Sequence, residues 1–342
     1  SEKIYIDEDN KNILVLSESM TDTYSNNHDG MQDKINEFIN KFDMKLSGKL
    51  YFCNEGLIKN AHLFHTLKLR LRNSNFKNIE AFRSVHTLEI CGCCDVTDVS
   101  SLGNVYKLNL SHCENISDVS ALGNVHELNL SHCENISDVS ALGNVYKLNL
   151  RYCVNISDVS VLGNIHELNL SYCENVSDVS ALGNVHELNL SYCYNIVDFS
   201  ALRNVMYLHL CGCVGVKNVE PFKNSYKLDL RGCENVTDVS ALKSVQRLTL
   251  RGCNNITDVN MLTNVHKLNI YQCKNINDVG NLRNLKILIT DSSVIGIHLL
   301  KNLEVLHIDE TCCKKSSYKI DNTLKKLQQI NENVKIIEEF DL

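Results

Sequence analysis

Cysteine, histidine and acidic side chains recur at regular spacing and could carry chemistry. The 342 residues include 16 Cys, 13 His and 41 Asp or Glu. Ten cysteines are spaced by 20 residues: Cys93, Cys113, Cys133, Cys153, Cys173, Cys193, Cys213, Cys233, Cys253 and Cys273. Such a stack could form disulfides, bind metal or pack as small apolar groups. Because stacked side chains run parallel and do not point at each other, we expect reduced structural thiols.

Catalytic and metal-binding arrangements find little support. Cys91–Gly92–Cys93 and Cys211–Gly212–Cys213 have metal-ligand spacing, but they lie six repeats apart, about 29 Å at the rise of a parallel sheet. His112 and Cys113 are adjacent, but their side chains should point to opposite sides of the coil, so they do not form a catalytic pair. Weak zinc binding by His112 and His132 is the remaining metal-site alternative. No phosphate-binding loop or nucleophile elbow is present. The sequence predicts a protein that is not an enzyme, with no catalytic residues, cofactor or metal.

Stacked acids and amides have a simpler role in turns. One column is Asp98, Asp118, Asp138, Asp158, Asp178, Asp198, Asp238, Asp258 and Asp278, and another is Asn115, Asn135, Asn155, Asn175 and Asn195. We expect each side chain to accept backbone N–H groups of its own turn. A calcium array is the alternative, but its glycine-rich pattern is absent. The Gly-Asn pairs at 123–124, 143–144, 163–164 and 183–184 predict turns with glycine at positive φ.

The elements that position these columns follow from a 20-residue period running from Val85 to Asn284. In the repeat from Val125 to Asn144, the predicted inward residues are Val125, Leu128, Leu130, Cys133, Ile136, Val139 and Leu142. The alternation around Leu128 and Leu130 predicts one strand per repeat, and the three-residue steps that follow favour 3₁₀ turns. Because 20 residues leave no room for a long helix, we expect shallow curvature and a rod about 60 Å long.

The L-x-x-L-x-L-x-x-N/C spacing resembles that of leucine-rich repeats. The segments Cys113–Leu122 (CENISDVSAL) and Cys253–Leu262 (CNNITDVNML) resemble the cysteine-containing class found in F-box leucine-rich-repeat proteins. The resemblance implies an α/β solenoid: a right-handed coil with a parallel concave sheet and short turns on its convex side. It also implies, as an alternative function, the substrate-recognition component of a ubiquitin ligase. The repeat is shorter than is usual in that class, and no F-box motif is visible.

The ends of the array depart from the period. We predict an N-terminal cap at 1–45, with strands at Lys3–Ile6 and Ile13–Leu16 and a helix at Met31–Phe42. Degenerate repeats follow at 46–84, and ten regular repeats occupy 85–284. The segment 285–342 is predicted to hold drifting repeats and a C-terminal cap. That cap would contain a helix over Asp321–Asn331, with Leu324, Leu327 and Ile330 inward, and a last strand over Val334–Phe340.

The formal net charge of −7 disfavours a general nucleic-acid or membrane coat. Ser1 to Leu16 contains four acids and no secretory apolar stretch, and the thiol column suits a reducing compartment. We therefore expect an intracellular protein, cytoplasmic or nuclear, and a monomer in preference to an oligomer.

The strand positions that face away from the core are the candidate binding surface. Lys107, Glu127, Lys147 and Glu167 alternate in charge and predict lateral ion pairs, and the asparagines at 109, 129, 149, 169 and 189 could form an amide ladder. An exposed aromatic and acidic patch follows. The predicted partner-binding residues, suited to a protein or peptide with basic side chains, are Arg151, Tyr152, Glu167, Tyr172, Glu187, Tyr192 and Tyr207.

A second, basic patch is predicted at Lys227, Arg231, Arg247, Arg251 and Lys267, where phosphate or an acidic protein could bind. It lacks the interleaved aromatic platform that nucleic-acid bases need. The leading interpretation is a non-catalytic protein-interaction scaffold. Because Ser111–Val125 and Ser131–Val145 are identical, a structural or self-assembling rod is a further alternative.

Overall fold

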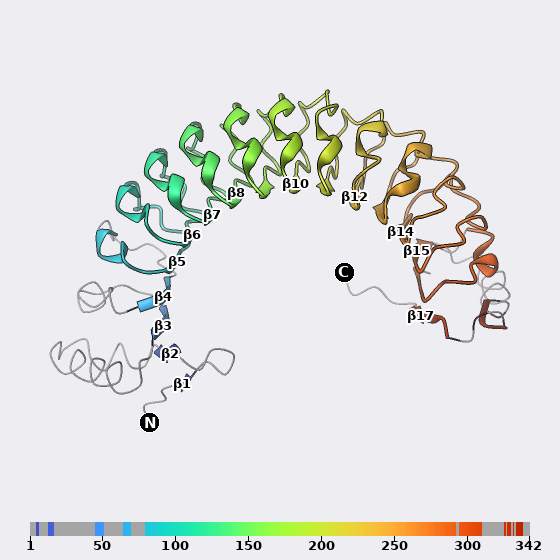
Figure 1. Cartoon of the computed structure of the whole chain (residues 1–342), viewed down its shortest axis with the longest axis horizontal. Helices are drawn as coiled ribbons and strands as arrows, with labels where there is room; N and C mark the ends of the chain where they lie inside the picture. Colours follow the sequence, from blue (N-terminus) through green and yellow to red (C-terminus); the bar gives the residue numbers. More distant parts are fainter. Residues whose placement is uncertain are drawn as a thin grey trace. The chain divides into compact units, whose positions relative to one another are not determined.

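A computed structural model describes residues 79–291 and 294–309, together with 325, 327–329, 331 and 333–337. It also describes the backbone of the strands at 5–6, 13–16, 45–50 and 64–69. The chain divides into two compact units, Ser1–Asn169 and Leu170–Leu342. Within each unit, strands of successive repeats lie side by side and 3₁₀ segments run along the opposite side of the coil (Figure 1).

The first unit is a parallel sheet with one antiparallel strand at its start. Its strands are β1 (Tyr5–Ile6), β2 (Ile13–Leu16), β3 (Lys45–Leu50), β4 (Phe64–Leu69), β5 (Thr87–Ile90), β6 (Lys107–Asn109), β7 (Glu127–Asn129), β8 (Lys147–Asn149) and β9 (Glu167–Asn169). β1 is antiparallel to β2, and each later strand is parallel to the one before it. The 3₁₀ segments are η2 (Glu80–Phe82), η3 (Ser100–Leu102), η4 (Ser120–Asn124), η5 (Ser140–Asn144) and η6 (Ser160–Asn164).

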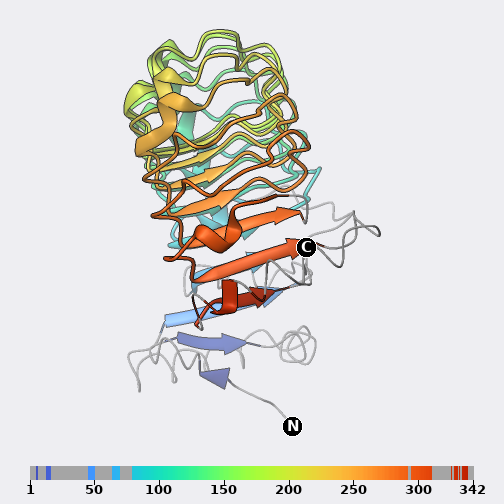
Figure 2. The same cartoon turned by 90° about the vertical axis from the view of Figure 1, so that its right-hand side faces the viewer.

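The second unit repeats this design, and its strands are all parallel, as the arrows of Figure 2 show. They are β10 (Glu187–Asn189), β11 (Tyr207–His209), β12 (Lys227–Asp229), β13 (Arg247–Thr249), β14 (Lys267–Asn269), β15 (Ile287–Asp291), β16 (Val305–Asp309) and β17 (Lys335–Ile337). The 3₁₀ segments are η7 (Ser180–Asn184), η8 (Leu202–Asn204), η9 (Glu220–Phe222), η10 (Ser240–Ser244) and η11 (Ile297–Leu299). The predicted leucine-rich-repeat solenoid with 3₁₀ turns is confirmed.

The core consists of the positions that the period predicts. All seven inward residues of the repeat Val125–Asn144 are at most 2% exposed. The pattern holds because Leu128 points inward from β7, and the spacing of three in the return segment brings Cys133, Ile136, Val139 and Leu142 to the same interior. Among the described repeats these positions stack into apolar columns, except that buried Ser225 takes the place equivalent to Val125 and donates its hydroxyl to the carbonyl of Val205 at 2.7 Å.

The glycines of the Gly-Asn pairs have a different role from the predicted one. Gly103, the equivalent position one repeat earlier, has φ −60°, so positive φ is not the reason for glycine here. A Cβ built on Gly123 would lie 2.4 Å from the carbonyl oxygen of Ala141, and one on Gly143 would lie 2.8 Å from that of Val161. Glycine is needed because the next repeat approaches too closely for a side chain.

Parts of the predicted caps lie outside the described residues, among them the helix Met31–Phe42, Leu324 and Ile330. Within the described part, Leu327 is fully buried in a helical stretch, and β17 lies in the first half of the predicted last strand, Val334–Phe340. No helix in the described part of the chain is long and apolar enough to cross a membrane.

Candidate binding surface

In the first unit, a row of alternating charges crosses the sheet face. Lys107, Glu127, Lys147 and Glu167 are paired in register across β6–β9. The Nζ of Lys107 lies 2.8 Å from Oε2 of Glu127, and Lys147 pairs with Glu167. The hydrogen bond from Lys107 is the main cause that lowers the pKa of Glu127 below its ordinary value. The predicted lateral pairs are confirmed, and each partly exposed pair stabilises the fold by at most about 1 kcal/mol.

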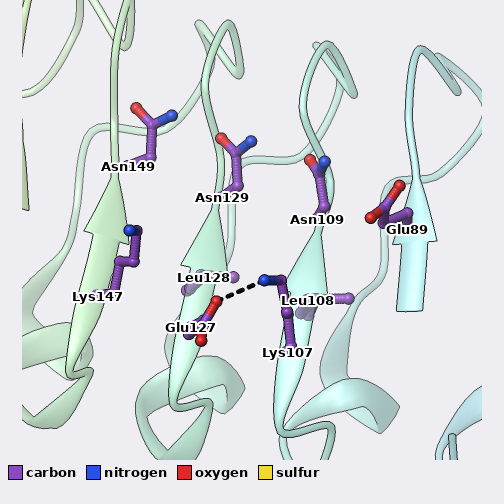
Figure 3. A pocket seen from close by; sticks show the side chains of 9 residues that line it. All are labelled: Glu89, Lys107, Leu108, Asn109, Glu127, Leu128, Asn129, Lys147 and Asn149. Carbon is purple, nitrogen blue, oxygen red and sulfur yellow. Dashed lines mark ion pairs between the residues drawn. The ribbon is translucent and has the colours of Figure 1, made fainter. Parts of the chain in front are cut away.

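A shallow hollow of about 180 Å³ lies over β6–β8 of this unit. Figure 3 shows its two polar rims: the charged row of Lys107, Glu127 and Lys147, and a row of amides from Asn109, Asn129 and Asn149. Glu89 continues the amide row on β5, and Leu108 and Leu128 turn away into the core. The sheet face therefore offers hydrogen-bond donors and acceptors at the spacing of the strands.

The asparagines on this face form local turns. The Oδ1 atoms of Asn109 and Asn129 accept the backbone N–H of the serine two residues ahead at 3.0 Å, and Asn149 accepts that of Arg151 at 3.1 Å. This Asx-type bond ends each short strand and starts the turn that follows. The amide ladder is not confirmed, because in these three residues Oδ1 bonds to the local backbone.

The turn after each of the strands β5–β14 contains a left-handed residue. It is glycine at 92, 212, 232 and 252, with φ between 66° and 74°. At the equivalent positions of other repeats φ is also 60–63°, although the residues carry side chains: His112, His132, Tyr152, Tyr172, Tyr192 and Gln272. A left-handed residue with a Cβ costs roughly 1–2 kcal/mol relative to glycine. The aromatic column thus occupies backbone positions for which glycine is better suited.

Three predicted partner-binding residues lie in the first unit. The guanidinium carbon of Arg151 lies 5.1 Å from the ring centre of Tyr152, which is half-buried in its left-handed turn. His112, His132 and Tyr152 stack in sequence, with ring centres 4.1 and 4.5 Å apart. Glu167 is on β9 and is already paired with Lys147. Because the rings stack face to face, this part of the column presents ring edges instead of faces.

In the second unit, Tyr172 and Tyr192 stack with ring centres 4.5 Å apart, and Tyr194 meets Tyr192 edge-on at 6.3 Å. The Tyr192 ring lies over Gly212, where a Cβ would come within 2.6 Å of its Cδ1. The thiol of Cys211 donates to Oη of Tyr192 at 3.3 Å, and this hydrogen bond is the main cause that raises the pKa of Tyr192. These contacts hold the ring in one position.

Glu187 and Tyr207 are separated from these tyrosines, because both lie at the start of their strands. The Tyr207 ring contacts His186 at 5.2 Å and Tyr226 at 5.7 Å. Glu187 is half-buried on β10, in register with Tyr207. The second unit therefore has two aromatic groups, one in the left-handed turns and one at the strand starts.

The predicted basic patch lies entirely in the second unit. Lys227, Arg247 and Lys267 are in register on β12–β14. The Nε of Arg231 donates to Asp229 Oδ2 at 2.9 Å, and Asp229 is only 5% exposed. Although burial opposes it, hydrogen bonds from His209 and Arg231 lower the pKa of Asp229, so that this carboxylate is charged. Asp229 therefore neutralises Arg231 and fixes its position.

Sequence reasoning missed a second ring column, which precedes the strands of the first unit. His86, Tyr106, His126, Tyr146 and His166 stack at 4.6–4.8 Å between neighbouring ring centres. The signal was present as the dipeptides Tyr-Lys and His-Glu, which alternate from repeat to repeat between residues 106 and 167. Tyr106, His126, Tyr146 and His166 each directly precede a residue of the charged row.

The cysteine column has a structural role. Sγ of Cys153 donates to the carbonyl of Leu130 at 3.1 Å, and Sγ of Cys213 donates to that of Leu190 at 3.0 Å. Burial raises the pKa of both thiols to about 12, so that neither is a thiolate at neutral pH. The cysteines that the structure describes are free, as predicted. Among the described residues no cluster of three or more His, Cys, Asp or Glu side chains could hold a metal ion.

The polar columns of the return segment divide into two roles. Asp138 Oδ1 accepts the N–H of Ser140 at 2.8 Å. Each of Asp118, Asp158, Asp178, Asp198 and Asp238 likewise accepts the N–H of the serine two residues ahead, as predicted. The prediction for the asparagine column was wrong. Asn155 Nδ2 donates to the carbonyl of Glu134 at 2.8 Å, and Asn195 donates to that of Glu174. These amides connect one repeat to the next.

Comparisons with known proteins agree with the fold. No family model and no curated protein matches the sequence. The structure is similar to that of an internalin (InlF) from Listeria monocytogenes, with 25% identity and a TM-score of 0.57, over 80% of this chain and 85% of that one. The functional domain of InlJ from the same organism, which includes a cysteine ladder, gives 14% identity and a TM-score of 0.49, over 86% and 66%.

A leucine-rich-repeat protein of Leptospira interrogans gives 16% identity and a TM-score of 0.39, over 84% of this chain and 99% of that one. None of these neighbours confirms the F-box-like subclass. The geometry and the internalin similarity together identify the fold as a leucine-rich-repeat solenoid with free cysteines in its core.

Proposed function

We propose that this protein is a non-catalytic scaffold that binds a protein or peptide through its sheet face and the adjoining left-handed turns. The observation that carries the proposal is the strain in the aromatic column. Tyr172 and Tyr192 adopt φ values of 63° and 62°, whereas Gly212, Gly232 and Gly252 fill the same position in the following repeats.

The two tyrosines carry a backbone cost that glycine, which fills the same turn in other repeats, does not have. Each side chain at a left-handed position costs roughly 1–2 kcal/mol, and one stacked aromatic pair returns about 0.5–1.5 kcal/mol. Tyr172 and Tyr192 stack on each other, and Tyr192 also meets Tyr194 edge-on and accepts a hydrogen bond from the Cys211 thiol, so that these contacts offset part of the strain. Backbone strain that is held in place by the surrounding structure is concentrated at binding sites, and tyrosine is enriched at binding hot spots.

The double variant Tyr172→Gly/Tyr192→Gly tests the proposal. Glycine fits the backbone of both turns, so we expect the fold to be retained, with a stability change of about 1 kcal/mol or less. Full-length wild-type and variant protein would be immobilised, and the proteins captured from source-cell extract would be compared quantitatively. We expect at least one partner to be retained by wild type and lost with the double variant.

Gln272→Gly is the matched control, because Gln272 has φ 62° in the same turn but no aromatic ring. The control should retain the wild-type partners. If the double tyrosine variant retains every partner that wild type binds, the aromatic column is not a binding element. Concentration-dependent light scattering of the purified chain tests the self-assembling rod, which requires growth in mass with concentration.

The acidic residues of the predicted footprint give the partner its expected charge. Glu187→Lys should weaken binding of a partner with basic side chains, because the carboxylate lies half-buried on the sheet face of β10. Glu187→Gln should have a smaller effect. Equal affinity for all three proteins would remove Glu187 from the footprint.

A further inference from the structure

The sheet face of the second unit carries a group of cations, most of which have no ion-pair partner among the described residues. The group, here called the basic face, is Lys227, Arg247 and Lys267 at the strand starts and Arg231 and Arg251 in the turns two residues beyond the strands. In the described part of the chain, only Arg231 of these five forms an ion pair, with Asp229.

In the equivalent column of the first unit, the charged side chains are paired with each other. There, Lys107 pairs with Glu127 and Lys147 pairs with Glu167 across neighbouring strands. On β12–β14 the three aligned positions are all cationic, and like charges directly opposite each other on a sheet are destabilising. The fold is the same in both places, so the backbone does not require this difference in charge.

The cations form two rows, one at the starts of the strands and one in the turns that follow the strands. Between the rows lie Asp229 and Thr249, and beside the row in the turns lie Gly232 and Gly252, which leave the backbone uncovered. The positive potential extends beyond β14. Lys267 and Lys335 add to the effect of burial in lowering the pKa of His307 on β16.

We propose that the basic face binds an acidic peptide segment of a partner protein. This inference rests on the proposed scaffold function but uses other residues than the tyrosine column. The carboxylates of such a segment supply the missing counter-charges to Lys227, Arg247 and Lys267, and Arg251 extends the contact toward the strand ends.

The aromatic residues at this face distinguish a peptide from a nucleic acid. Arg247 lies 5.7 Å from the ring centre of Tyr226, and Arg251 lies 5.1 Å from that of Tyr271, which is 8% exposed. Tyr271 is nearly buried and Arg247 lies over the ring of Tyr226, so these rings do not form the row of stacking surfaces on which single-stranded nucleic acids depend. Charge without stacking surfaces favours the carboxylates of a protein.

The test is fluorescence anisotropy of full-length protein with a labelled peptide of alternating glutamate and glycine. A peptide with glutamine in place of glutamate and a single-stranded oligonucleotide of equal charge are the comparison probes. The binding variant is Lys227→Glu/Arg247→Glu/Lys267→Glu. The control is Lys217→Glu/Lys243→Glu/Arg283→Glu, which reverses three exposed cations outside the strands and changes the net charge equally.

We expect the binding variant to raise the Kd for the acidic peptide about tenfold or more and the control variant to change it less than about twofold. Added salt should weaken wild-type binding. The corresponding glutamine variant, Lys227→Gln/Arg247→Gln/Lys267→Gln, should give an intermediate loss and covers the case in which the glutamate variant does not fold.

Three results would overturn the inference: no binding of the acidic peptide to wild type, equal weakening by both glutamate variants, or tighter binding of the oligonucleotide. The last would make the basic face a nucleic-acid surface. The tyrosine test is separate. If Tyr172→Gly/Tyr192→Gly loses a captured partner while the acidic peptide fails to bind, the scaffold function stands and this inference fails.

Discussion

The left-handed turns of the second unit allow one substitution to be compared at matched sites. Gly212, Gly232 and Gly252 have φ values of 70°, 66° and 74°. A Cβ on Gly232 or Gly252 would meet no heavy atom closer than 3.9 Å, whereas a Cβ on Gly212 would lie 2.6 Å from Cδ1 of Tyr192. Alanine therefore tests backbone strain alone at two sites, and strain plus displacement of the Tyr192 ring at the third.

The magnitudes follow from these geometries. The left-handed conformation costs alanine roughly 1–2 kcal/mol, and the loss of unfolded-state freedom offsets about 0.4–1 kcal/mol. Gly232→Ala and Gly252→Ala should each destabilise the protein by about 1 kcal/mol. Overpacking adds roughly 1–3 kcal/mol, so Gly212→Ala should cost about 2–4 kcal/mol.

Urea unfolding of the full chain, followed by circular dichroism, measures the differences, provided that the m-value is unchanged. A local readout is the alkylation rate of Cys211, which should rise in Gly212→Ala because the thiol loses its contact with Tyr192. Equal destabilisation by Gly212→Ala and Gly232→Ala would refute the position of the Tyr192 ring. An unchanged stability of Gly232→Ala would refute the left-handed turn.

Three further predictions concern the rest of the coil. Cys153→Ala should destabilise the protein by about 2 kcal/mol, because it leaves a small cavity and removes the hydrogen-bond donor to the carbonyl of Leu130. Cys153→Ser should destabilise it less, because the hydroxyl can replace that donor. If unfolding measurements show the serine variant to be the less stable of the two, the thiol packs without a hydrogen bond. Exposed Cys94 should react with iodoacetamide in the native state, and buried Cys133 only after unfolding, as mass spectrometry of the labelled peptides would show. The hydrogen bonds from the N–H and hydroxyl of Ser140 lower the pKa of Asp138 below 3.8. Their contribution to the stability of the fold is therefore complete above that pH and is lost as the pH falls through the folded-state pKa. Asp138→Asn should reduce the acid sensitivity of the unfolding midpoint, and an unchanged pH profile would contradict this role.

Much of the fold could be predicted from sequence because each repeat contacts mainly its neighbours. With a fixed period, the apolar positions of one repeat must stack on those of the next, so that Leu128, Leu130 and Cys133 are assigned to the core without knowledge of any long-range contact. The lateral pairing of Lys107 with Glu127 follows from the same register.

The candidate site was less predictable, because the positions of its side chains depend on backbone torsion angles and on how closely neighbouring repeats approach each other. The tyrosine column was expected on an exposed face, but Tyr152, Tyr172 and Tyr192 lie half-buried in left-handed turns. Tyr207 was expected near these tyrosines and instead contacts His186 and Tyr226. No residue pattern gives the sign of φ at a position occupied by glycine in some repeats and by tyrosine in others.

The sequence by itself determined the repeat, the parallel strands and the identity of the core columns, because periodic burial leaves one arrangement that covers the apolar positions. The tertiary structure decided what the polar and glycine columns do. It shows that Gly123 is required by the carbonyl of Ala141 and that Asn155 donates to the preceding repeat, since both depend on contacts between repeats. It also shows which cations are neutralised, because ion pairing depends on where charged ends meet in space.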